Sequence, residues 1–278
     1  MGLRYNAKVK LSSRLPDSER FSVLMAVILL AYASARFVNL PLRTFSLEIG
    51  GFFLPLQFNI NTVLSVLVAA LTASGMDWLL RGHPKLGEGF QYSHWLLPAL
   101  TAWVISLPLA NLPLSPLWWL AFLIGALLLT MLIFAEYVSV DPEDRYYAVV
   151  SIALTALAYG MFLTLAISLK ALGARLVLTL PALLISSFLI SYRVQLLRSP
   201  AKVEGLPLLG IAFVSVEIAG ALHYWPLSAI SYGLALLGVL YALNNFLFSI
   251  SEGESTFEAA KEPSAVLLIF WILAALIR

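Results

Sequence analysis

The sequence predicts an all-α fold, a polytopic transmembrane helix bundle with about nine spans and a small extracytoplasmic β-hairpin. Composition is the first reason. Of 278 residues, 61% are hydrophobic and only 12% are charged, whereas soluble domains average about 45–50% apolar and about 25% charged residues. The second reason is spacing, because the apolar residues fall in blocks of about 15 to 25, enough helix to cross about 30 Å of hydrocarbon. A water-soluble fold of this length could not bury so much apolar surface.

Apolar runs between charged and turn residues define the expected spans. They cover residues 21–40, 62–81, 95–111, 116–135, 143–172, 175–197, 206–222, 227–250 and 263–277. Ser115-Pro116 and Asp141-Pro142 each place a capping oxygen before a proline at the first helical position. Gly173 is expected to end the fifth span. Because the last run is the shortest, eight spans and an interfacial helix are the alternative.

Lysine and arginine residues are distributed unevenly between the predicted loops. With the N-terminus inside, twelve of the 17 lie in cytoplasmic segments, four lie outside, and Arg36 lies within a span. Cytoplasmic loops of membrane proteins carry this excess. The sequence therefore predicts a membrane protein with a cytoplasmic N-terminus and an extracytoplasmic C-terminus. Residues 1–20 form a basic cytoplasmic segment and residues 21–278 a single transmembrane domain.

Residues 54–61 depart from the helical pattern. Apolar and polar residues or proline alternate there, with Leu54, Leu56, Phe58 and Ile60 on one face. A period of two is typical of a strand. With residues 45–49 and the turn-forming pair Gly50-Gly51 before it, the segment predicts a β-hairpin over about residues 45–60, outside the membrane. The alternative is an early start of the second span, broken by Pro55.

A short sequence repeat suggests related halves. Pro113-Leu114-Ser115, followed by Gly125, recurs as Pro226-Leu227-Ser228, followed by Gly238, at the same spacing. An offset of four spans would make the halves parallel repeats of the kind that some transporters use. Chance recurrence explains four matched residues better than a true repeat does.

Polar residues inside or beside the spans are the candidate sites, because charge within a bilayer is costly and often functional. The outer set is Arg36, Glu217, His223 and Tyr224, and the inner set is Asp77, Arg81, His83, His94, Glu136, Asn244 and Asn245. We expect an ion pair between Arg36 and Glu217, with extension of the Arg36 side chain to the outer headgroups as the alternative. For Asn244 and Asn245, hydrogen bonds between helices are favoured over a cavity lining.

Several reaction classes lack their signatures. There is no cysteine, which excludes disulfides, thiolate nucleophiles and iron–sulfur clusters, and the motifs of P-loop NTPases, serine hydrolases and zinc proteases are absent. His83, His94 and Asp77 are predicted on one side of the membrane as two imidazoles and a carboxylate, but ordinary interfacial positions explain them better than a metal site. We therefore assign no catalytic residue, metal or cofactor.

Four segments carry a family resemblance: residues 71–84 (LTASGMDWLLRGHP), 94–104 (HWLLPALTAWV), 135–144 (AEYVSVDPED) and 222–228 (LHYWPLS). Through them nearly the whole chain resembles an uncharacterised family of bacterial multi-pass membrane proteins, a domain of unknown function. The resemblance implies a single membrane domain and supplies no catalytic or binding residue.

Three functions remain open. A non-enzymatic role, as an accessory or scaffold subunit or as a binder of lipids or pigments, is favoured by the uncharged middle of the spans. A transporter or flippase for an uncharged or lipidic solute is the alternative, supported by the repeat and by prolines within spans. The third is a membrane enzyme acting on a lipid headgroup, with Asp77, Arg81, His83, His94 and Glu136 as acid, base and phosphate clamp. Expected partners are membrane lipids and other membrane subunits, not nucleic acid.

Overall fold

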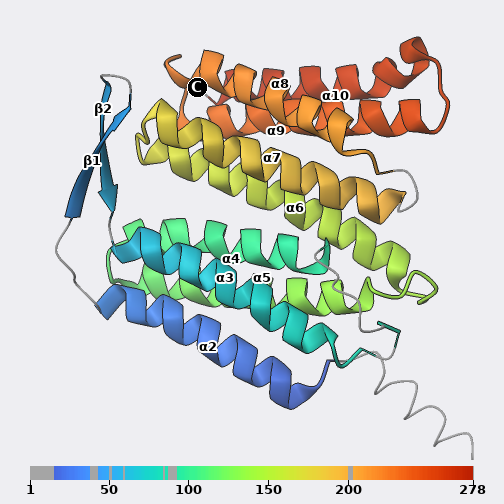
Figure 1. The fold of residues 1–278 in the computed structure, drawn as a ribbon. Coiled ribbons are helices and arrows are strands. Elements are labelled where there is room, and N and C mark those ends of the chain that lie inside the picture. Colours follow the sequence, from blue (N-terminus) through green and yellow to red (C-terminus); the bar gives the residue numbers. More distant parts are fainter. Residues whose placement is uncertain are drawn as a thin grey trace, which may run out of the picture. The chain divides into compact units, whose positions relative to one another are not determined.

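The computed structural model describes residues 16–37, 43–49, 52–58, 60–83, 85–86, 93–199 and 203–277. This part of the chain is predominantly helical (Figure 1), with α2 Ser18–Phe37, α3 Ile60–Leu80, α4 Ser93–Asn111, α5 Pro116–Val138, α6 Tyr147–Ala171, α7 Leu176–Arg198, α8 Gly205–His223, α9 Ala229–Ser251 and α10 Thr256–Leu276. Two strands, β1 Arg43–Ile49 and β2 Phe52–Phe58, follow α2. The helical architecture expected from the sequence is therefore confirmed.

Eight of the described helices, α3 to α10, are long and apolar enough to cross a membrane. The last of them differs from the prediction, because α10 begins at Thr256 instead of residue 263 and has 21 residues. Ser255 accounts for the difference, since its hydroxyl accepts a hydrogen bond from the Glu258 backbone N–H at 3.4 Å, the first half of a capping box. The last helix is thus not too short to span, while α2 as a ninth span stays a prediction.

The start of α6 was predicted wrongly and its end correctly. The helix begins at Tyr147, not at residue 143, because the Asp141 and Asp144 carboxylates accept backbone N–H groups two residues ahead, at 3.1 and 2.8 Å, and so form turns instead of a helix cap. Gly173 follows the helix with φ of +60°, and the Ala174 N–H bonds the Leu169 carbonyl at 3.1 Å. These are the features of a Schellman stop.

β1 and β2 form an antiparallel pair in which Leu47 lies opposite Leu54 and Ile49 opposite Phe52. Pro55 in β2 lacks an N–H donor and lies opposite Ser46, which a two-stranded sheet tolerates because both strands are edges. Gly50 and Gly51, the expected turn, lie outside the described residues. That the strands lie outside the membrane stays a prediction.

The chain divides into two compact units, Met1–Tyr147 and Ala148–Arg278. In the first, α3 packs against α2 and α4, and α4 also packs against α5; in the second, α7 packs on α8, and α9 packs against α7, α8 and α10. The prediction of one transmembrane domain over residues 21–278 stays a prediction. So does the parallel repeat, in which Ser115 and Ser228 both precede the first residue of a helix.

Glycines let helix pairs within each unit approach closely. A Cβ at Gly125 of α5 would lie 2.8 Å from Ile105 Cγ2 of α4, and one at Gly238 of α9 would lie 2.6 Å from Phe270 Cβ of α10. Small residues at such crossings allow van der Waals packing between membrane helices, where the hydrophobic effect contributes little. Gly210 of α8, in contrast, has open space around it.

We expect Gly238→Ala to lower the free energy of unfolding in detergent by about 1–3 kcal/mol, because Phe270 Cβ is fixed to its backbone and cannot move aside. The control is Gly210→Ala, which adds the same methyl group where nothing obstructs it and should leave stability unchanged or raise it by up to about 1 kcal/mol through helix propensity. Thermal unfolding of both variants measures the difference. Equal effects would contradict close packing of α9 on α10.

Candidate functional site

The inner candidate residues belong to both units: Asp77, Arg81, His83, His94 and Glu136 lie in the first, and Asn244 and Asn245 lie in the second. Within the first unit Asp77 and Arg81 form one group, while His83 lies close enough to His94 for their charges to interact. Asp77 and Arg81 pair with each other on the last turns of α3, with Oδ2 and Nη2 2.7 Å apart, and the Arg81 side chain is 68% exposed. Arg81 is therefore already engaged by a carboxylate.

His94, Glu136 and Ser139 form the buried group of the first unit. His94 Nδ1 lies 3.1 Å from Glu136 Oε2. The Ser139 hydroxyl lies 2.9 Å from the Glu136 backbone carbonyl oxygen, 3.2 Å from the Glu136 carboxylate and 3.4 Å from the same imidazole nitrogen. The Glu136 side chain is fully buried, and a buried carboxylate requires such partners. A nucleophilic triad would place serine and carboxylate on opposite imidazole nitrogens. This group instead joins the start of α4 to the end of α5.

The metal hypothesis finds no support in the geometry. In the described part of the chain, no three His, Asp or Glu side chains are grouped so that they could hold a metal ion. Nor do the residues assigned to acid, base and phosphate clamp share a reacting position, because Arg81 pairs with Asp77 and His94 with Glu136. We therefore give the enzyme hypothesis no residue roles.

A surface network beside His83 was missed by the sequence analysis. Lys85 Nζ lies 2.7 Å from Asp141 Oδ1 and 3.2 Å from Glu143 Oε2, and the Lys85 hydrogen bond lowers the pKa of the Asp141 carboxyl. The Lys85 backbone N–H donates to His83 Nδ1 at 3.2 Å. Burial lowers the pKa of the His83 imidazole, so His83 is neutral at pH 7.

The outer candidates lie in the second unit, with the exception of Arg36. Lys170 of α6 donates to the backbone carbonyls of His223 and Trp225 at 2.5 and 3.3 Å, which places a cation at the negative end of the α8 dipole. Lys170 was not among the sequence candidates. His223 and Tyr224 form an edge-to-face ring pair, and Glu217 is exposed. The Arg36 side chain lies outside the described residues, so its ion pair with Glu217 stays a prediction.

Asn244 and Asn245 connect α9 to α7. Asn244 Nδ2 donates to Ser191 Oγ at 3.0 Å, and Gln195 Nε2 donates to the Asn244 carbonyl at 3.1 Å. Arg198 Nη1 donates to Asn245 Oδ1 at 2.6 Å. The two helices thus make the interhelical hydrogen bonds that polar residues provide inside membrane bundles.

This network extends along α7 as a polar stripe of Ser187, Ser191 and Gln195, spaced four residues apart on one helix face. Ser187 Oγ is buried without a hydrogen-bond partner among the described residues, and the hydroxyl of Tyr159 on α6 faces the Asn244 side chain. Sequence reasoning found Asn244 but missed the stripe, although polar residues every four positions in an apolar helix are a readable signal. Partnerless polar atoms at this depth indicate room for water or a polar ligand.

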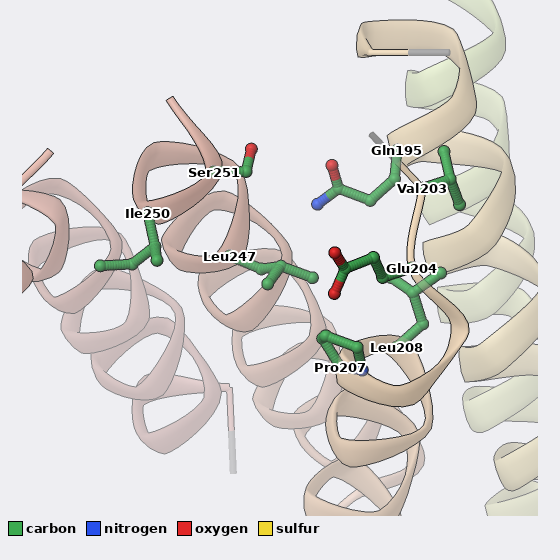
Figure 2. Close-up of a pocket in the computed structure, with 8 residues that line it drawn as sticks. All are labelled: Gln195, Val203, Glu204, Pro207, Leu208, Leu247, Ile250 and Ser251. Carbon is green, nitrogen blue, oxygen red and sulfur yellow. The ribbon is translucent and has the colours of Figure 1, made fainter. Parts of the chain in front are cut away.

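A pocket of about 480 Å³ opens where this stripe ends (Figure 2). The C-terminal turns of α7 and α9 and the N-terminal end of α8 form it, with Gln195, Val203, Glu204, Pro207, Leu208, Leu247, Ile250 and Ser251 as its lining. Figure 2 shows the Gln195 amide and the Glu204 carboxylate directed into the same space, opposite the Leu247 side chain. Glu204 precedes the first residue of α8, yet its side chain does not cap that helix. Five of the eight lining residues are thus apolar, and the other three supply an amide, a carboxylate and a hydroxyl.

Most of the chain, residues 40–277, matches a family model described as Protein of unknown function (DUF5656). The chain belongs to this family. Neither a curated protein nor a solved structure matches it. Membership in DUF5656 supports the resemblance found in the sequence and assigns no residue a role, so the function has to be argued from the geometry.

For this DUF5656 member we expect Glu136→Ala to lower the free energy of unfolding by about 3–5 kcal/mol, because it leaves His94 and Ser139 buried without their carboxylate. Glu136→Gln keeps an acceptor oxygen and should lose less. The matched control is Asp77→Ala, which removes an exposed i,i+4 pair worth about 0.3–0.5 kcal/mol. Denaturant titration in detergent measures all three, and a loss for Asp77→Ala as large as for Glu136→Ala would contradict the account.

The His83 environment predicts a pH effect. Because the folded pKa is below the unfolded value of 6.5, the unfolded chain binds more protons, and stability should fall as the pH drops below about 6.5. His83→Gln should flatten the dependence of the unfolding temperature on pH between about 7.5 and 5.5. If the unfolding temperature of the wild-type protein instead rises as the pH drops from about 7.5 to about 5.5, and His83→Gln removes that rise, the neutral buried state is refuted.

Proposed function

We propose that the chain is an integral protein of a bacterial cytoplasmic membrane with nine spans, α2 included. Its N-terminus is cytoplasmic, and the C-terminus and the β1–β2 pair lie on the opposite side. The twelve-to-four bias of basic residues supports this orientation. In this topology the C-terminal ends of α7 and α9 and the N-terminal end of α8, and therefore the pocket, face the cytoplasm.

The role that the geometry supports best is non-enzymatic binding of a membrane amphiphile. The observation that carries it is the pocket itself, a space of about 480 Å³ in which five apolar residues face the polar side chains of Gln195, Glu204 and Ser251. Ligand sites of about this size combine apolar walls with a few polar groups that orient the ligand. Beside a lipid–water boundary, such a lining fits a molecule with a tail and a polar head.

Transport of an uncharged or lipidic solute is the second candidate, favoured by the polar stripe that continues from Gln195 along α7. Ser187 Oγ, buried without a hydrogen-bond partner among the described residues, would receive a solute that moves inward from the pocket. Pro181 also lies inside α7, and proline is a common cause of a kink in a membrane helix. Uptake of a solute by reconstituted vesicles, abolished by Asn244→Leu, would favour transport over simple binding.

We expect the full-length protein, purified in mild detergent, to retain phospholipid in native mass spectra. Val203→Trp should reduce the retained lipid severalfold, because a bulky ring at this half-buried wall position fills the pocket. The control is Val214→Trp on the exposed face of α8, 40% exposed and outside the pocket lining. Equal retention in both variants, each with wild-type thermal stability, would rule out the pocket as the binding site.

A further inference from the structure

We propose that the pocket selects amphiphiles whose head carries a positively charged amine with N–H donors. This inference rests on the proposed amphiphile-binding function and adds the chemical class of the ligand. Its basis is the hydrogen-bonding capacity of Gln195 and Glu204, which face the same space (Figure 2).

Gln195 presents an acceptor to the pocket. Its Nε2 donates to the Asn244 carbonyl at 3.1 Å, and because a carbonyl can only accept, the amide orientation is fixed. Because Nε2 carries two hydrogens, the side-chain oxygen and one N–H are both left for a ligand. The residue is 6% exposed and forms part of the pocket wall.

Glu204 supplies the charge. Its carboxylate makes no ion pair or hydrogen bond with the residues that the structure describes, and it does not cap α8. An ionised carboxylate only accepts hydrogen bonds. The third polar wall residue, Ser251, already donates its hydroxyl proton to the Phe248 carbonyl at 2.7 Å. The polar lining thus offers acceptors, a negative charge and one remaining amide N–H, and no lining side chain offers a formal positive charge.

A ligand head that complements this lining must donate hydrogen bonds and carry positive charge. A primary ammonium group does both, whereas a trimethylammonium group has the charge but no N–H. A head that ends in phosphate or sulfate and has no amine would place a negative charge beside the negative charge of Glu204. The aliphatic side chains of Val203, Leu208 and Leu247 line the rest of the pocket and suit a hydrocarbon chain.

The amine could belong to a membrane phospholipid or to a free cationic amphiphile, and the experiment separates these sources. The delipidated full-length protein is titrated with phosphatidylethanolamine and phosphatidylcholine of identical acyl chains, and bound lipid is counted by native mass spectrometry. Dodecylammonium and dodecyltrimethylammonium are then added as competitors. If dodecylammonium displaces phosphatidylethanolamine, a free amine is sufficient for binding. If it does not, the ligand is a phospholipid. Both results agree with amine recognition.

We expect tighter binding of phosphatidylethanolamine than of phosphatidylcholine, and a loss of up to about fivefold for phosphatidylethanolamine in Glu204→Gln, the range of a solvent-accessible charge pair. Phosphatidylcholine binding should fall less, because its trimethylammonium head has the charge but no N–H to donate. Glu262→Gln, an exposed acid of α10 outside the pocket, is the matched control. Glu204 is exposed, so its substitution should not affect folding.

Two results would overturn the inference and are distinguishable. Equal binding of both lipids, unaffected by Glu204→Gln but lost in Val203→Trp, leaves the amphiphile pocket standing and removes its amine selectivity. Lipid binding that survives Val203→Trp removes the pocket as a binding site and the selectivity with it.

Discussion

The structure depends on one constraint: hydrocarbon cannot hydrogen-bond, so every polar group placed in it needs a partner within the protein. Helices satisfy the backbone, and the polar side chains follow the same rule. Glu136 is fully buried against His94 and Ser139, the Lys170 ammonium binds carbonyls at the end of α8, and Asn244 joins α9 to α7. These contacts fix helix ends to one another, and glycines such as Gly238 bring the helices close enough for packing between them.

The same constraint draws attention to the polar groups that have no hydrogen-bond partner among the described residues. In the described part of the second unit, Ser187 Oγ is buried without a hydrogen-bond partner, and the polar stripe to which Ser187 belongs ends at Gln195 in the wall of the pocket. The Glu204 carboxylate faces that pocket instead of capping its own helix. Other buried polar atoms without a partner in the described residues, such as Thr101 Oγ1 of α4, are not beside this pocket. His94, Glu136 and Ser139 of the first unit, in contrast, bind each other, which is typical of a structural role.

Hydropathy and helix punctuation predicted where most helices lie, because span length is imposed by the bilayer and Pro116 and Gly173 act locally. The start of α6 was wrong since Asp141 is engaged by Lys85, a contact between loops far apart in sequence. The start of α10 was late because charge was given more weight than the Ser255 cap. For the site, Asn244 could be found from its residue type, whereas the pocket depends on Gln195, Glu204 and Ser251 meeting from three helices. These three residues come together only in the folded protein, so no single sequence segment could predict the pocket.

The measurement that tests the account most directly is the accessibility of single cysteines, which the absence of native cysteine makes unambiguous. Glu254→Cys lies in the loop after α9, close in sequence to the pocket residue Ser251, and Ala174→Cys lies in the loop between α6 and α7. In intact cells a membrane-impermeant maleimide should label Ala174→Cys, and Glu254→Cys only after permeabilisation. Labelling of Glu254→Cys in intact cells, or of both cysteines from the same side, would contradict a membrane protein whose pocket faces the cytoplasm.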